Sequence, residues 1–174
     1  MPTVIIAGGG TGGHLMPALA IAERIRALHP DIEPVLVGAV RGVEREILPK
    51  REFRFHLLPA EPIYRRQWWR NARWPMVFPR LMHEVRAVLD QERPAAALGT
   101  GGYAAGPLVW SAARRGIPCA IQEQNASPGI ATRFLARRVS HMYLGVPEIR
   151  AALPPLPDTR LFDTGNPIVP PDPG

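Results

Sequence analysis

Five glycines within residues 8–13 constrain this chain more than any other feature. They follow a short apolar segment, residues 3–7, and precede a segment in which Leu19, Ala22 and Ile25 are spaced to form one apolar helical face. Glycine lets the backbone turn tightly and approach a ligand closely. The N-terminus of the following helix presents unpaired N–H groups that favour an anion. The sequence therefore predicts a strand, a phosphate-binding turn and a helix.

Short apolar segments alternate with amphipathic segments along the whole chain, which is typical of a parallel sheet with helices on its faces. The predicted strands are residues 3–7, 35–38, 53–58, 95–99, 119–122, 141–144 and 161–164. The predicted helices are residues 17–28, 43–48, 79–91, 107–115 and 130–137, with a short helical turn at 148–153. We therefore expect an α/β fold, a Rossmann-like parallel sheet with helices on both faces. It should form one domain over residues 1–164, and the proline-rich residues 165–174 should form a linker or tail.

A second glycine-rich loop, residues 99–107, again lies between a predicted strand and a predicted helix. It contains Gly101, Gly102 and Tyr103, and the tyrosine could offer a hydroxyl or a ring face to a ligand. Ligands of such sheets bind beyond the carboxyl ends of the strands, so this loop should lie at the same edge as residues 8–13. It favours a second anion-binding turn, although close packing of a helix on a strand would also require glycines.

Polar side chains that could take part in proton transfer occur in two of these loops. His14 opens the first helix, where the helix dipole disfavours a charged imidazole and suits a general base, although a cap or surface residue would look the same. Glu123, Gln124 and Asn125 directly follow a predicted strand. They could bind sugar hydroxyls, and Glu123 could accept a proton. A solvated loop is the alternative interpretation.

The glycines at 8, 10 and 13 also fit the dinucleotide-binding pattern. That class needs an acidic residue near the end of the second strand to bind the ribose, whereas the second predicted strand here ends in Val37-Gly38-Ala39. A nicotinamide-dependent oxidoreductase is therefore disfavoured, although Arg41 leaves room for a phosphorylated cofactor. We expect no cofactor and no metal.

Composition narrows the class of protein further. Lys and Arg number 21 against 15 Asp and Glu, and this net charge of +6 suits an anionic partner. The single cysteine, Cys119, excludes an internal disulfide and should be a buried core thiol. The sequence contains no apolar run long enough to span a membrane, and its start lacks the basic region of a secretory signal. We therefore expect a cytoplasmic location.

A basic, aromatic segment interrupts the pattern between residues 65 and 78. Tryptophan prefers the membrane–water interface, and arginine is attracted to anionic headgroups. Nucleic acid could use the same chemistry, and tryptophans packed in the core are a third interpretation. We favour a membrane surface and no nucleic acid. The predicted contacts are Arg66, Trp68, Trp69, Arg70, Trp74 and Phe78.

Several of these motifs together resemble the MurG family. They occur in the same order and at matching spacing over essentially the whole chain. They are Gly9-Gly10-Thr11-Gly12-Gly13-His14, Gly38 followed by Glu44 and Leu48-Pro49-Lys50, Gly101-Gly102-Tyr103, Glu123-Gln124-Asn125, and Gly165-Asn166-Pro167. The resemblance implies the two-domain GT-B fold, of which this chain would be the N-terminal, acceptor-binding half.

The resemblance also implies a reaction. N-acetylglucosamine would pass from UDP-GlcNAc to the undecaprenyl-diphosphate-linked muramoyl-pentapeptide, converting lipid I to lipid II in peptidoglycan synthesis. The enzyme would be inverting, metal-independent and peripheral to the cytoplasmic side of the bacterial plasma membrane. The two glycine turns would hold the acceptor diphosphate, and His14 would match a catalytic residue. The positions implied for the sugar nucleotide are Thr11, Gly12, Gly13 and Asn125.

Two departures from the family pattern bear on activity. Val169 stands where the family usually has an arginine that helps hold the donor, and the sequence stops at Gly174, before the second domain that carries most of the donor site. We therefore expect this chain alone not to transfer sugar at a useful rate. A non-catalytic module that binds a lipid diphosphate is the alternative of a different class. A transferase of the same fold with another acceptor is also compatible with the residues.

Overall fold

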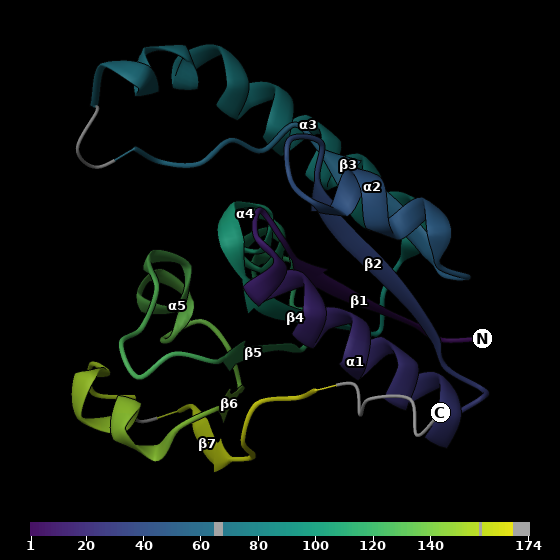
Figure 1. Ribbon diagram of the computed structural model, residues 1–174, viewed down its shortest axis with the longest axis vertical. Coiled ribbons are helices and arrows are strands. Elements are labelled where there is room, and N and C mark those ends of the chain that lie inside the picture. Colours follow the sequence, from purple (N-terminus) through teal and green to yellow (C-terminus); the bar gives the residue numbers. More distant parts are fainter. Residues whose placement is uncertain (65–67, 157, 169–174) are drawn as a thin grey trace.

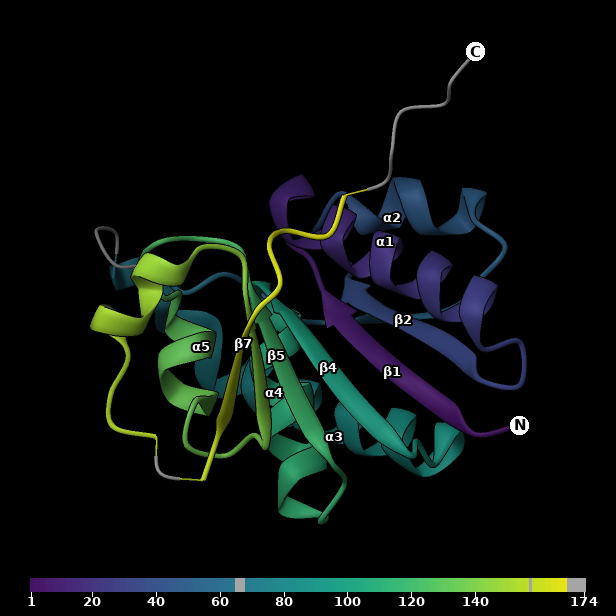
Figure 2. The same cartoon turned by 90° about the horizontal axis from the view of Figure 1, so that it is seen from below.

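Seven parallel strands form one sheet in the order β3-β2-β1-β4-β5-β6-β7 (Figures 1 and 2). The computed structural model describes residues 1–64, 68–156 and 158–168, without the side chains of Trp68 and Arg70. The strands are β1 (Thr3–Gly8), β2 (Glu33–Ala39), β3 (Arg54–Leu58), β4 (Ala96–Gly101), β5 (Cys119–Glu123), β6 (His141–Leu144) and β7 (Arg160–Asp163). All seven predicted strands are present, and the expected fold class is confirmed.

Helices cover both faces of this sheet, as predicted. They are α1 (Gly12–Leu28), α2 (Glu44–Ile47, continued by a 3-10 turn, Leu48–Lys50), α3 (Trp74–Glu92, preceded by a 3-10 segment, Trp68–Arg73), α4 (Gly102–Arg114) and α5 (Ile130–Leu135), and a further 3-10 segment spans Pro147–Ala152. One apolar core joins Leu15 and Leu19 of α1 to Ile6 of β1. The other lies on the opposite face, where Leu81 of α3 and Leu108 of α4 are fully buried.

Three helices begin earlier than predicted. The predicted helices 17–28, 79–91 and 107–115 each start at a proline, because proline is common in a first helical turn. Each proline instead lies five residues after the start of its helix. A proline there removes one intrahelical hydrogen bond, which the packing of α1, α3 and α4 tolerates. As a result, α1 and α4 begin within the two glycine turns.

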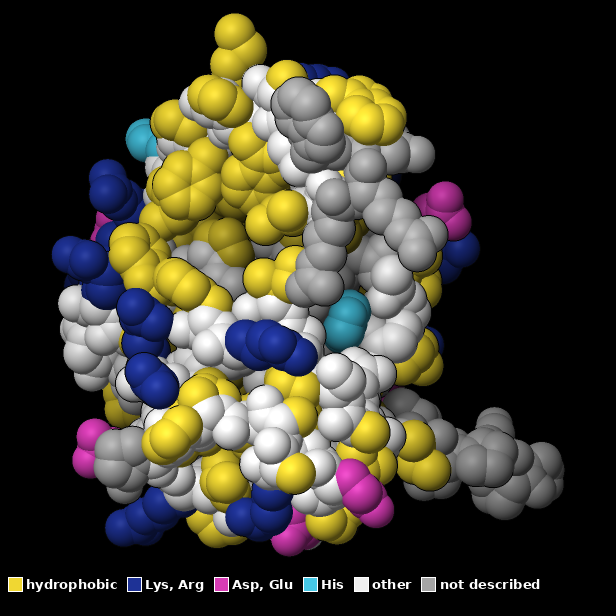
Figure 3. All heavy atoms as spheres, turned by 90° about the vertical axis from the view of Figure 1, so that its left-hand side faces the viewer, with side chains coloured by type: hydrophobic (Ala, Val, Ile, Leu, Met, Phe, Trp, Pro, Cys, Tyr) yellow, Lys and Arg dark blue, Asp and Glu magenta, His cyan; other side chains and the backbone are white. Residues whose placement is uncertain are grey.

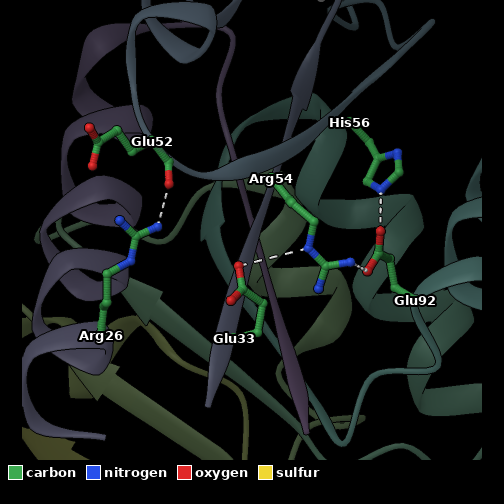
Figure 4. A network of polar contacts seen from close by, with 6 residues as sticks. All are labelled: Arg26, Glu33, Glu52, Arg54, His56 and Glu92. Carbon is green, nitrogen blue, oxygen red and sulfur yellow. Dashed lines mark hydrogen bonds and ion pairs between the residues drawn. The ribbon is translucent and has the colours of Figure 1, made fainter. Parts of the chain in front are cut away.

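The edge of the sheet opposite the glycine turns is held by ion pairs (Figure 4). Glu92, at the end of α3, is buried and accepts from Arg54 Nη1 at 2.9 Å and from His56 Nε2 at 2.7 Å, both from β3. Arg54 Nε also lies 3.7 Å from Oε1 of Glu33, at the start of β2. These contacts fix α3 against β2 and β3, so we assign them a role in stability.

A cavity of about 490 Å³ lies away from the glycine turns. It is bounded by Ile21 and Ile25 of α1 and by the middle of strands β4 to β6, with Thr164 and Pro167 at its rim. Its lining is mostly apolar and includes the polar residues Gln122, Ser140 and His141.

Candidate functional site

The two glycine turns, residues 8–13 and 99–103, meet at the carboxyl edge of the sheet. Strands β1 and β4 are neighbours and parallel, so their carboxyl ends lie side by side. The Gly9 N–H points at the Gly101 carbonyl, 3.4 Å from nitrogen to oxygen. A Cβ on Gly102 would lie 1.7 Å from the Gly9 carbonyl oxygen, and one on Gly10 would lie 2.3 Å from the Tyr103 ring. Only glycine permits this approach, and Gly102 in addition has a φ of +81°.

Not every backbone N–H of the first turn is available to a ligand. Gly10 donates its N–H to Oε1 of Glu44, so this amide is already engaged within the protein. By contrast, among the described residues no acceptor faces the N–H groups of Gly12 and Gly13. The same holds for the N–H groups of Gly102 and Tyr103. The N-termini of α1 and α4 therefore present free donors at one place.

Glu44 is a residue of this site that sequence reasoning noted only as part of a resemblance. Its side chain is completely buried and occupies the space left by three glycines, because a Cβ at Gly9, Gly38 or Gly42 would overlap it. Its second oxygen, Oε2, has no hydrogen-bond partner in the described part of the chain. The available signal was two glycines, Gly38 and Gly42, shortly before an acidic residue.

His14 is held in one orientation by Thr100. The imidazole Nδ1 lies 3.1 Å from the Thr100 carbonyl oxygen, and the Thr100 hydroxyl donates to the His14 carbonyl at 2.8 Å. A carbonyl can only accept, so Nδ1 must carry the proton and a neutral ring then has its lone pair on Nε2. A Cβ on Gly101 would lie 2.4 Å from Nδ1, so the ring packs directly on that glycine.

The same Thr100 carbonyl links His14 to the loop after β5. Gln124 donates its Nε2 amide to that oxygen at 2.7 Å. Thr100 is fully buried, whereas His14 and Gln124 are half-buried. The first turn of α1, the end of β4 and the loop after β5 thus contribute one connected set of hydrogen bonds, which includes the imidazole.

Glu123 lies differently from the expectation. It is only 3% exposed, and four donors surround it. Oε1 accepts from the backbone and side-chain nitrogens of Asn125, and Oε2 accepts from the Gly129 N–H and the Thr132 hydroxyl. A proton could reach this carboxylate only by displacing one of those donors. The geometry therefore favours Glu123 as the organiser of residues 123–132 and disfavours it as a proton acceptor.

Asn125 and Tyr103 keep groups that a substrate could use. Glu123 holds the Asn125 side-chain nitrogen, which leaves the amide oxygen of this exposed residue available. Burial, followed by the nearby charge of Glu44, raises the pKa of Tyr103 above its ordinary value. The Tyr103 hydroxyl therefore stays protonated and can donate a hydrogen bond.

Cys119 carries the single thiol of the sequence. The thiol is buried, as predicted, and burial raises its pKa to about 11, so it stays protonated and unreactive. The described residues contain no group of three His, Cys, Asp or Glu side chains that could hold a metal ion.

The predicted membrane segment exposes apolar side chains around the start of α3. Trp69, Met76 and Phe78 are 59%, 83% and 46% exposed. Trp74 is half-buried, with its ring centroid 6.1 Å from that of Phe78. Figure 3 shows hydrophobic side chains gathered on the face that carries this region and α5. Arg66 and the side chains of Trp68 and Arg70 lie outside the described residues. The described helices include none that is long and apolar enough to cross a bilayer.

Comparisons with known proteins agree with this geometry. Residues 4–144 match the N-terminal domain of glycosyltransferase family 28. The chain is 41% identical over 165 residues to a UDP-N-acetylglucosamine--N-acetylmuramyl-(pentapeptide) pyrophosphoryl-undecaprenol N-acetylglucosamine transferase of Carboxydothermus hydrogenoformans, covering 95% of this chain and 44% of the relative. A relative of the same name from Desulforudis audaxviator is 42% identical over 167 residues, covering 96% and 44%.

Solved structures show the same fold. MurG of Acinetobacter baumannii superposes with a TM-score of 0.74 at 23% identity, over 93% of this chain and 46% of that one. A Staphylococcus aureus MnaA–UDP structure gives 0.66 at 10% identity, over 87% and 41%. The chain thus spans less than half the length of these relatives, and its resemblance to the MurG family is confirmed.

Proposed function

Because this chain belongs to glycosyltransferase family 28, we propose that it forms the acceptor-binding half of an enzyme that transfers N-acetylglucosamine from UDP-GlcNAc to a lipid-linked muramyl-pentapeptide. The observation that carries the proposal is the position of His14. Its ring packs on Gly101, directly before α4, so Nε2, which carries the lone pair in a neutral ring, lies close to two helix N-termini with free N–H groups. An anion bound there would place a neighbouring hydroxyl within reach of a base.

His14 is the proposed general base. The acceptor hydroxyl gives its proton to Nε2 while its oxygen forms a bond to C1 of the donor sugar. The bond from C1 to the UDP oxygen breaks, and UDP leaves with the electron pair, so the configuration at C1 inverts. Thr100 supports the step, because its carbonyl fixes the proton on Nδ1 and stabilises the imidazolium that forms.

The free amides of Gly12, Gly13, Gly102 and Tyr103 are the proposed contacts for the acceptor diphosphate. Helix N-termini favour this charge. Thr11 and the free amide oxygen of Asn125 are exposed at the same edge and are proposed to contact the sugars. Most of the UDP site would come from a second domain, in keeping with the share of the relatives that this chain spans.

The transferase proposal is tested by restoring the second half. A chimera of this chain with the C-terminal half of the Carboxydothermus hydrogenoformans relative should convert UDP-GlcNAc and a short-chain prenyl-diphosphate muramyl-pentapeptide to the disaccharide product. Residues 1–174 alone should give no measurable turnover, because most of the donor site is proposed to belong to the second domain. Product would be followed by chromatography of radiolabelled sugar. A folded, donor-binding chimera without turnover would contradict the proposal and favour a non-catalytic module. Robust product from this chain alone would contradict the need for a second half.

The exposed apolar side chains at the start of α3 are proposed to contact the cytoplasmic surface of the plasma membrane, where a lipid-linked acceptor is held. Replacing Trp69 and Phe78 together by alanine should reduce sedimentation with anionic vesicles about tenfold or more, since each ring would lose a buried contact. The matched control is Phe134→Ala, which removes an aromatic of similar exposure from α5. Equal binding of wild type and the double variant would refute this surface, and an equal loss in Phe134→Ala would extend it to α5.

A further inference from the structure

A group of arginine side chains lies at the carboxyl edge of the sheet, beyond the first glycine turn. Arg41, Arg73 and Arg80 line a cavity of about 350 Å³. The cavity is formed by the segments that leave β2 and β3 and by the first turns of α3. These arginines take no part in the free amide sites of the two glycine turns or in the proposed chemistry at His14.

The charges in this cavity are not balanced within the protein. Arg41 pairs with the nearly buried Glu61, with 3.2 Å between Nη1 and Oε1. Among the described residues, Arg73 and Arg80 have no carboxylate partner. The lining of the cavity therefore carries three guanidinium groups against the one carboxylate of Glu61, which Arg41 already holds. Guanidinium groups in pairs suit planar oxyanions, because each can donate two parallel N–H bonds.

The cavity directly adjoins the proposed acceptor site. Arg41 lies three residues before Glu44, which holds the Gly10 N–H. The charge of Arg41 also acts on the Tyr103 hydroxyl. A ligand bound at the glycine turns thus has the arginine cavity on the β3 side.

The other side of the glycine turns is occupied by protein. Asn166 donates its side-chain amide to the Gln124 carbonyl at 3.4 Å, and a Cβ on Gly145 would lie 1.9 Å from the Asn166 Oδ1. The segment that leaves β7 therefore covers the ends of β5 and β6. A substituent carried by the acceptor sugar would meet the segment that leaves β7 on one side and the arginine cavity on the other.

We propose that this cavity, lined by Arg41, Arg73 and Arg80, binds the terminal carboxylate of the peptide carried by the acceptor. The inference rests on the proposed function, because the acceptor named for the relatives bears a pentapeptide. The carboxyl group of muramic acid takes the amino end of such a peptide, so its far end is a carboxylate. The apolar lining from Val40 and Val77 suits the alkyl side chains that precede it.

Three soluble probes separate this inference from the proposed function. All are short-chain prenyl-diphosphate muramyl sugars, one without peptide, one with a pentapeptide acid and one with the pentapeptide amide. Calorimetric titration of this chain should show the acid binding about tenfold more tightly than the amide. The variant R73Q/R80Q should lose that discrimination and still bind the peptide-free probe. Arg86→Gln, an exposed arginine of α3 outside the cavity, should behave as wild type.

Each other outcome overturns the inference in a recognisable way. Equal binding of acid and amide by wild type would exclude a carboxylate site while leaving the acceptor function intact. Equal weakening of all three probes in R73Q/R80Q would assign the arginines to the diphosphate. A loss of anionic-vesicle binding in that variant, with discrimination unchanged, would assign the cavity to a lipid headgroup. Failure of all three probes to bind would contradict the acceptor function itself.

Discussion

Replacing His14 by glutamine is expected to lower kcat of the chimeric transferase by about 10²- to 10⁴-fold. The Thr100 hydroxyl donates to the backbone carbonyl of residue 14, and this bond does not depend on the side chain, so the first turn of α1 should keep its geometry. Glutamine offers no basic nitrogen in place of Nε2, so the acceptor hydroxyl loses its proton acceptor. The acceptor KM should change little, because the amides of Gly12 and Gly13 are untouched. Steady-state kinetics over a range of acceptor concentrations measures both quantities.

The matched control for this variant is His29→Gln. His29 lies at the other end of α1, is exposed, and contributes its backbone N–H to the Ile25 carbonyl. It should leave kcat and the acceptor KM unchanged. A His14→Gln enzyme with wild-type kcat would remove His14 from the chemistry. A variant with raised KM and normal kcat would make it a binding residue.

Much of this site can be predicted from the order of a few residues along the chain. Glycines directly after a strand and before a helix predict a backbone turn with free N–H groups, and parallel neighbouring strands bring two such turns to one edge. The predicted strands and the convergence of residues 8–13 with 99–103 follow from local pattern alone. These features need no knowledge of which distant side chains meet.

The partners of the polar side chains could not be predicted in the same way. Glu44 binding Gly10 and Thr100 binding His14 join residues 34 and 86 positions apart. They depend on how the chain packs around three glycines and on strand register. Local pattern was misleading for Pro17, Pro79 and Pro107, because tertiary packing outweighs the loss of one helical hydrogen bond.

The buried carboxylate of Glu44 limits where an anion can bind at the first glycine turn. A buried carboxylate beside an anion site would repel a diphosphate bound at Gly10. The charge is separated from the free amides because Gly12 and Gly13 lie in the first turn of α1, beyond the Gly10 amide that Glu44 holds. The turn thus has one part that is fixed by the protein and one part that is open to a ligand.

Replacing Glu123 by alanine is expected to cost about 3 kcal/mol of unfolding free energy and to lower Tm by about 6–12 °C. Four donors would lose their acceptor, and water can replace it easily only at the exposed Asn125 and Gly129, not at the buried Thr132. Glu123→Gln keeps one acceptor oxygen and should lose roughly half as much. Glu148→Ala, which removes an exposed carboxylate without a partner among the described residues, should leave Tm unchanged. Thermal unfolding of the three variants, followed by circular dichroism, measures these shifts.

A general base at position 123 would give a different pattern. Glu123→Gln would then keep a wild-type Tm and lose as much kcat in the chimera as His14→Gln, because a proton acceptor would be lost from an intact loop.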